Sequence, residues 1–248
     1  MPTMNLSAAA RLDLWQAAER RDPVDRSLLL AATAGEPGGE DQLARLPLGR
    51  RDARLLALHR ALGGGALEAT VRCPECGEPA EFSVDPQALV AHAADAAPPA
   101  ELEVDGFTVV WRSPDSRDVA AAATAGDAAA AERVLLGRCV TAATGPDGEV
   151  DGTALSSAAR EAIARAMADA DPLAEVLVGV SCPACGTSFA ADLDVAAFVW
   201  AELRADAQRL LREVDALARA YGWTEPEVLA LDDGRRAAYL ELVREGTG

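Results

Sequence analysis

The chain has 248 residues, half of them hydrophobic, and a formal net charge of −17 at pH 7. A chain of this length can bury one large core or two modest ones. All 23 basic residues are arginines spread along the sequence, so no basic cluster is present to bind nucleic-acid phosphates. No stretch approaches the ~20 apolar residues of a membrane span, and the start lacks a basic and apolar leader, so we expect a cytoplasmic protein.

Residues 1–66 are predicted to form an N-terminal helical region. Leucines recur at helical spacing over 6–20. Asp22-Pro23 has the form of an N-cap followed by proline at the first helical position, and a third helix is expected over 49–62. Gly63-Gly64-Gly65 ends that helix, and because the run does not precede a helix it is not a phosphate-binding loop.

Two later segments share one pattern, a strand, a tight turn and a second strand. Strand-like runs lie on both sides of a Cys-Pro-x-Cys-Gly turn within residues 67–92 and again within 175–194, and Asp85-Pro86 is expected to begin a short helix at the end of the first segment. We therefore predict a first and a second zinc-knuckle hairpin in these segments, with metal ligands Cys73, Cys76, Cys182 and Cys185.

Residues 93–174 are predicted to form an inserted hairpin and helical lobe. A linker of small residues and proline covers 93–100, and Asp105-Gly106 is a favourable two-residue hairpin turn. Helices are expected over 115–144, with a break near Gly126, and over 156–170.

Residues 195–248 are predicted to form a C-terminal helical region. Its longest helix is expected over 195–221, and Thr224 to Glu227 has the capping-box pattern of a following short helix. A last helix is expected over 235–244. The predicted buried face of the longest helix consists of apolar residues at steps of 3 or 4: Val199, Leu203, Ala207, Leu210, Val214, Leu217 and Tyr221.

The two cysteine turns together offer four thiolates, the donor set of a closed structural Zn²⁺ site. About 105 residues separate Cys76 from Cys182, against about 15–20 in a compact zinc ribbon. The expected fold is therefore α+β and mainly helical, a split zinc ribbon of two β-hairpins with a helical insertion and helical N- and C-terminal arms. Closing so long a loop costs only a few kcal/mol more than closing a short one, whereas structural zinc contributes on the order of 10 kcal/mol.

A redox dithiol remains an alternative role for the cysteine pairs, although it requires a cysteine at a helix N-terminus.

Catalytic motifs are absent from the sequence, so we expect no enzymatic activity. The two histidines, His59 and His92, have no motif around them, and no nucleophile elbow or phosphate loop is present. Cys139 is expected to be a small core residue rather than a ligand. Arg50-Arg51 and Arg235-Arg236 are expected to lie on solvated faces, with binding to an acidic patch of a partner as the alternative.

Short packing motifs follow one another along nearly the whole chain. They are Leu14-Trp15, Pro23 to Leu30, Leu46 to Asp52, the two knuckles, Asp171-Pro172-Leu173, Phe198 to Glu202, Glu213 to Ala218, Tyr221-Gly222-Trp223 and Arg235 to Leu240. These stretches resemble the baseplate and hub assembly proteins of T-even-type tailed phages, in the versions carried by bacterial phage-tail-like contractile injection systems.

The resemblance implies a non-enzymatic structural or assembly component of a contractile particle. Its implied partners are other baseplate, hub or spike proteins, and a homo-oligomer is compatible with it. A chaperone that leaves and a subunit that stays are both consistent with the sequence. The zinc prediction rests on the cysteines and not on the family. The alternative is a zinc-ribbon regulatory or adaptor protein acting on nucleic-acid machinery, against which the net charge of −17 argues.

Overall fold

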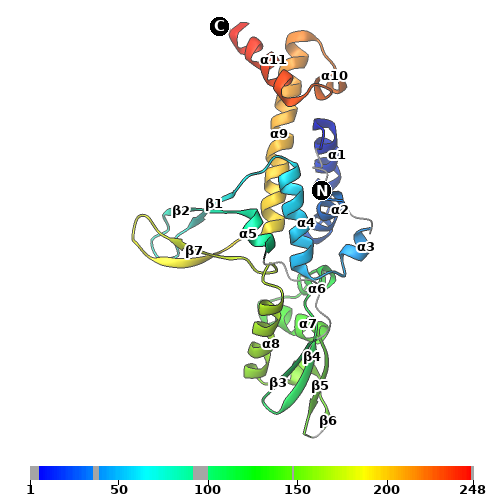
Figure 1. The fold of residues 1–248 in the computed structure, drawn as a ribbon, viewed down its shortest axis with the longest axis vertical. Helices are drawn as coiled ribbons and strands as arrows, with labels where there is room; N and C mark the ends of the chain where they lie inside the picture. The colour runs from blue at the N-terminus through cyan, green and yellow to red at the C-terminus, as the bar shows by residue number, and fades with distance from the viewer. Residues whose placement is uncertain (1–5, 36–38, 92–99, 147, 247–248) are drawn as a thin grey trace.

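The computed structural model describes residues 6–35, 39–91, 100–146 and 148–246. Figure 1 shows an elongated molecule with three parts: a helical body, a pair of β-hairpins that projects to one side, and a lobe at the lower end. The chain is thus a mixed α+β protein with more helix than strand. Among the described helices, none is both long enough and apolar enough to cross a bilayer.

The helical body contains both the beginning and the end of the chain. Its N-terminal and C-terminal helices share one hydrophobic core, so the two expected helical arms pack together. Asp22 caps its helix as predicted, since its carboxylate accepts hydrogen bonds from the backbone N–H groups of Val24 and Asp25. The helices are α1 (Ala8–Glu19), α2 (Pro23–Thr33), α3 (Glu40–Leu43), α4 (Leu48–Ala61), α9 (Val195–Tyr221), α10 (Glu225–Leu229) and α11 (Asp233–Gly246).

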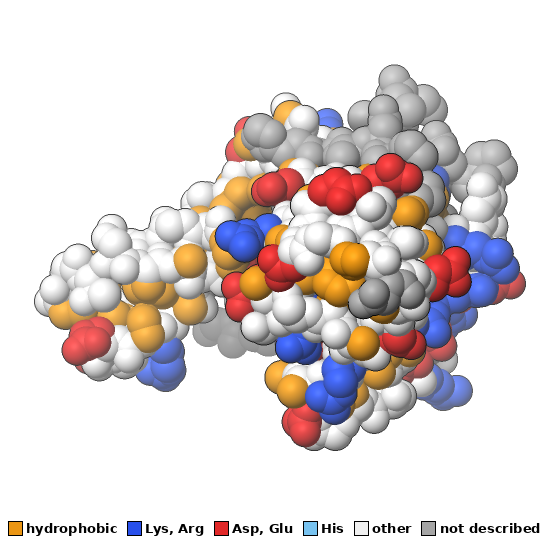
Figure 2. Space-filling model, turned by 90° about the horizontal axis from the view of Figure 1, so that it is seen from below, with side chains coloured by type: hydrophobic (Ala, Val, Ile, Leu, Met, Phe, Trp, Pro, Cys, Tyr) orange, Lys and Arg blue, Asp and Glu red, His pale blue; other side chains and the backbone are white. Residues whose placement is uncertain are grey.

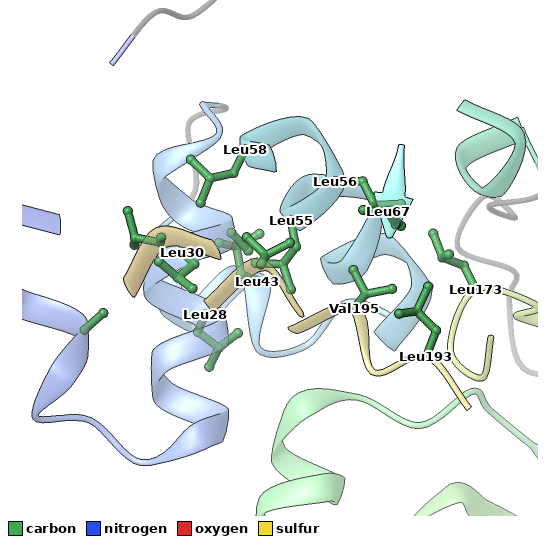
Figure 3. Packing of buried hydrophobic residues seen from close by; sticks show 14 of the residues in the cluster. Leu28, Leu30, Leu43, Leu55, Leu56, Leu58, Leu67, Leu173, Leu193 and Val195 are labelled. Atoms are coloured by element: carbon green, nitrogen blue, oxygen red, sulfur yellow. The ribbon is translucent and has the colours of Figure 1, made fainter. Parts of the chain in front are cut away.

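Leucine side chains fill the core of the body between α2, α4 and the first half of α9 (Figure 3). Each fully buried leucine contributes about 1.5–3 kcal/mol relative to an exposed one. The predicted buried face of α9 is confirmed at Val199, Leu203 and Leu210. It is wrong at Tyr221, which is 40% exposed because it is the last residue of α9 and stacks on Trp223 instead of entering the core.

The lobe is built on a four-stranded antiparallel sheet in the order β3-β4-β5-β6. The hairpin at Asp105-Gly106 is confirmed, with φ of 52° and 78° at the two turn residues. The helix predicted to continue to residue 144 is wrong, because residues from Val140 onward pair with β4 as a strand. The elements are β3 (Ala100–Val104), β4 (Phe107–Trp111), α6 (Ser116–Ala122), α7 (Ala128–Cys139), β5 (Val140–Gly145), β6 (Gly148–Glu149), a 3₁₀ turn (Gly152–Ala154) and α8 (Ser157–Ala170). The linker predicted before β3 lies, except for Ala100, outside the described residues.

Hydrogen bonds from the first two residues of α4 join the body to the lobe. The backbone N–H of Leu48 donates to the carbonyl oxygen of Pro114 at 3.2 Å. The buried carboxylate of Asp171 accepts a hydrogen bond from the N–H of Gly49 at 3.0 Å. Free N–H groups at a helix N-terminus favour a carboxylate, so Asp171 caps α4 from 122 residues away. These contacts hold the lobe at the body through Pro114, which follows β4, and through Asp171, which follows α8, and neither contact involves the cysteines.

Gly49→Ala is expected to destabilise this junction. A β-carbon at position 49 would lie 2.0 Å from Asp171 Oδ1 and 3.0 Å from Leu173 Cβ, so the cap would have to move. Overpacking of this kind costs about 1–3 kcal/mol. Urea denaturation measures the loss, and Gly126→Ala is the matched control, because a β-carbon there meets nothing within 4 Å. Equal free energies of unfolding for the two variants would contradict the prediction.

His59, for which the sequence suggested no role, is a fully buried link between α4 and α9. Its Nδ1 contacts a carboxylate oxygen of Glu202, and its Nε2 lies 2.9 Å from the carbonyl oxygen of Gly65. Both partners can only accept hydrogen bonds at neutral pH, so the ring satisfies both when it is doubly protonated. The hydrogen bond that the His59 ring donates to the Glu202 carboxylate raises the pKa of His59, against the lowering effect of burial.

A raised folded-state pKa gives His59 a pH-dependent contribution to stability. The contribution is fully present below the unfolded pKa of about 6.5 and is lost as the pH rises through the higher folded pKa. We expect the wild-type protein to exceed His59→Gln in free energy of unfolding at pH 6, with a smaller difference at pH 9. Urea titrations at both pH values test this, and a difference that does not change with pH would disprove it.

Two of the arginines expected on solvated faces are buried. Arg236 is 1% exposed, and its guanidinium donates to Glu213 at 2.7 Å and to the carbonyl oxygen of Leu231 at 3.0 Å. Arg51 is 9% exposed and donates to Asp52 at 2.7 Å. The expectation of solvated faces is wrong at these two positions, because each guanidinium has a partner that offsets the cost of burial.

Candidate metal centre

Two antiparallel hairpins carry the predicted ligands. The first consists of β1 (Leu67–Arg72) and β2 (Pro79–Val84), the second of β7 (Leu177–Ser181) and β8 (Ser188–Asp192). The bases of the hairpins are set in the body, where Leu67 and Leu193 belong to the main core (Figure 3). After β2 the chain continues into α5 (Pro86–Ala91). The cysteine turns lie at the far ends of the hairpins.

A small hydrophobic cluster holds the two hairpins against each other. Ala80 of β2 packs with Val180 and Ala191 of the second hairpin, and Phe82 and Phe189 flank them. Figure 2 shows the paired hairpins projecting from the molecule with hydrophobic side chains along their length. The cluster is small, and isolated two-stranded hairpins are at best marginally stable in water. A further link at the tips would therefore stabilise the pair substantially.

The two cysteine turns have the same backbone structure. In the first, Cys73 N–H donates to the carbonyl of Glu78 and Gly77 N–H donates to the carbonyl of Cys73, both at 2.9 Å. In the second, Cys182 and Gly186 make the equivalent bonds, also at 2.9 Å. Gly77 and Gly186 have φ of 74° and 76°, a left-handed conformation that glycine adopts without strain.

The turns place four sulfur atoms in one group. Cys73 Sγ lies 3.7 Å from Cys185 Sγ, and Cys76 Sγ lies 3.6 Å from Cys182 Sγ, so each close pair joins the two hairpins. All four sulfur atoms lie within 4.8 Å of one another. The first cysteine of each turn is buried and the second is exposed. The four ligands predicted from the sequence are thus brought together.

The donor set and its spacing fit a metal ion. A tetrahedral ion with metal–sulfur bonds of about 2.3 Å requires sulfur atoms about 3.8 Å apart, close to the two short distances found here. All five cysteines of the chain lie in the described segments, and none of them forms a disulfide. The four cysteines are therefore positioned to hold a metal ion.

The pKa values of the cysteine thiols also favour a bound cation. The hydroxyl and backbone N–H of Thr187 lower the pKa of Cys185 to about 6. For Cys76, the backbone N–H of Glu78 lowers the pKa, but desolvation and hydrogen bonds with the other three thiols outweigh it and raise the pKa to about 12. Crowded thiols resist forming several thiolates together, and a bound cation removes that resistance.

The structure also bears on Cys139 and on the hypothesis of a redox dithiol. Cys139 is completely buried in the lobe at the end of α7, which confirms the expectation of a core residue. Each Cys-x-x-Cys pair lies between two strands, whereas a redox dithiol requires a helix N-terminus at its first cysteine. His92, the other candidate side chain without a motif, lies outside the described residues.

Sequence reasoning missed the contribution of Thr187, whose Oγ1 lies 3.3 Å from Cys185 Sγ. Its position two residues after the second cysteine could have indicated it, since the backbone N–H at that place in a knuckle points at sulfur. Comparison with protein-family models, with curated proteins and with solved structures found no match for this chain.

Proposed function

We propose that Cys73, Cys76, Cys182 and Cys185 bind one structural Zn²⁺, which makes the paired hairpins a split zinc ribbon. Four thiolates form a closed site with no open position for a substrate, the arrangement of structural rather than catalytic zinc. The observation that carries the proposal is the grouping of all four sulfur atoms within 4.8 Å. Zinc favours sulfur donors and tetrahedral geometry over the oxygen-preferring Mg²⁺ and Ca²⁺.

Elemental analysis of the purified protein tests the metal and its identity. One equivalent of zinc per chain is expected, with loss of zinc in Cys182→Ser. Cys139→Ser is the matched control, because it changes the one cysteine outside the cluster and should keep the zinc. Four titratable thiols in the cluster without zinc, or another metal at full occupancy, would contradict the proposal.

We also propose a non-enzymatic role as a structural or assembly component of a contractile phage-tail-like particle. Support comes from the resemblance of ordered packing motifs to baseplate and hub assembly proteins. Two of those motifs, residues 46–52 and 171–173, meet in the hydrogen bond between Gly49 and Asp171, as expected if they are packing patterns. The body, the paired hairpins and the lobe also offer separate surfaces to different neighbours (Figure 1).

The role in assembly is tested in a strain that produces such particles. Deletion of the gene and the Cys182→Ser substitution are both expected to stop the assembly of complete particles, whereas Cys139→Ser should not. Intact sheaths that still contract in the Cys182→Ser strain would contradict the proposal. Mass spectrometry of purified wild-type particles then separates a resident subunit from a chaperone that leaves.

A further inference from the structure

An open apolar groove runs between two helices of the lobe, away from the cysteine cluster. Helices α7 and α8 both pack on the face of the sheet that carries Val109 and Trp111. Between them lies a groove with a volume of about 650 Å³. It continues to the junction with the body, where Leu48 and Pro114 line it. A volume of this size is in the range of binding sites rather than of packing defects.

Small side chains on the facing sides of the two helices create the groove. Ala131 on α7 and Ala164 on α8 line it, with Leu135 and Met167 as the larger apolar groups. Alanine at these positions leaves space that larger residues would fill. Ala164 is exposed, and Leu135 and Met167 are only half-buried, so this apolar surface is in contact with solvent.

The rim of the groove is acidic. Three exposed carboxylates line it, those of Glu132, Glu161 and Glu175. The one arginine among the described lining residues, Arg160, is already 3.6 Å from Glu132 in an ion pair. The groove therefore combines an apolar floor with a negative rim.

We propose that this groove binds an amphipathic helix of a partner protein, with apolar side chains in the groove and lysine or arginine against the rim. Helices bind grooves of this type through residues spaced three or four apart. The side of α8 that lines the groove extends from Arg160 to Ala168, about 12 Å at 1.5 Å per residue, which accommodates two turns of a helix.

The negative charge of the groove rim favours a basic partner over a second copy of this chain. A second copy would bring a net charge of −17 to an acidic rim, and like charges oppose association. A basic segment gains the opposite interaction. The inference goes beyond the proposed role in a particle, since it depends on neither the zinc nor the resemblance.

A binding titration with the purified full-length protein tests the proposal. The probe is a fluorescein-labelled 14-residue helix of leucine and lysine with leucine on one face, and a second probe replaces every lysine with glutamate. Fluorescence anisotropy should show saturable binding of the lysine probe and at least tenfold weaker binding of the glutamate probe. Ala164→Phe, which fills the groove from an exposed position, should weaken the lysine probe at least tenfold.

Ala129→Phe is the matched control, because Ala129 is an exposed alanine of α7 outside the groove. Binding of the lysine probe to this variant should equal binding to the wild type. Failure of the probe to bind, or equal affinity for all three proteins, would overturn the proposal. So would self-association in sedimentation that Ala164→Phe abolishes, which would make a second copy the occupant. Circular dichroism verifies that each variant is folded.

Discussion

Cys182→Ser is expected to release the metal and to unfold the paired hairpins while the helical body stays folded. Structural zinc contributes on the order of 10 kcal/mol, and without it the hairpins are left with the small cluster around Ala80 and Val180. Cys182 also lies 3.6 Å from Cys76, so its loss separates the first hairpin from the second at the tip. The body should persist because its core between α2, α4 and α9 is formed without the hairpin tips.

Hydrogen exchange followed by mass spectrometry measures this result by segment. Amides of β1, β2, β7 and β8 should exchange on the order of 100-fold faster or more in Cys182→Ser, whereas amides in the middle of α4 and α9 should keep their protection. Cys139→Ser should leave the hairpins protected. The zinc-free wild type, prepared with a chelator, should resemble Cys182→Ser. Protected hairpins in the absence of metal would show that packing alone holds them.

Asp118→Ala is expected to give the largest loss of stability in the lobe. The Asp118 carboxylate is completely buried and accepts hydrogen bonds from Arg112 at 2.6 and 3.0 Å and from Arg138 at 2.8 Å. Burial alone would raise the pKa of Asp118, but these arginines and the N–H of Asp115 hold it well below its usual range. The group is therefore ionised, and it connects α6 with α7 and with Arg112, the residue that follows β4.

Removing one partner of a buried ion pair costs about 3–5 kcal/mol, because the remaining charges lose their partner in a poorly solvated place. The loss should be at the lower end of this range, since Arg112 and Arg138 are 31% and 44% exposed and can recover contact with water. Urea denaturation of Asp118→Ala measures it. Asp169→Ala, an exposed carboxylate on α8, is the control and should change stability by less than about 0.5 kcal/mol. Equal stability of the two variants would contradict the prediction.

Local patterns predicted most helices and hairpins because their signals act over short distances. The apolar spacing over Val195–Tyr221 gave the bounds of α9, and Asp22-Pro23 gave the start of α2. The strand β5 was missed because Val140 follows α7 directly, without a glycine or proline between them. Its pairing with β4 is a contact over about 30 residues, and no local propensity encodes such a contact.

The sequence by itself determined the candidate metal ligands. Two cysteines separated by two residues on a turn can place both sulfur atoms on one metal, so each turn indicated a pair of candidate ligands. The packing of the two hairpins then brings the pairs into one group within 4.8 Å. The strands on either side of each turn were predictable from their strand-like sequence pattern. Gly77 and Gly186 were predictable because the tight turn requires a left-handed backbone conformation at their positions.

Only the tertiary structure decided which charged residues are buried and which apolar surface is left open. Arg236, Asp171 and His59 look like surface residues in the sequence, since burial of a charge depends on a partner that lies far along the chain. The groove between α7 and α8 also arises from packing, because alanines that favour a helix locally become the walls of an empty space only when two helices lie on the same sheet. Short-range geometry thus determined the candidate metal ligands, and long-range packing determined how they are grouped and which surfaces are left open.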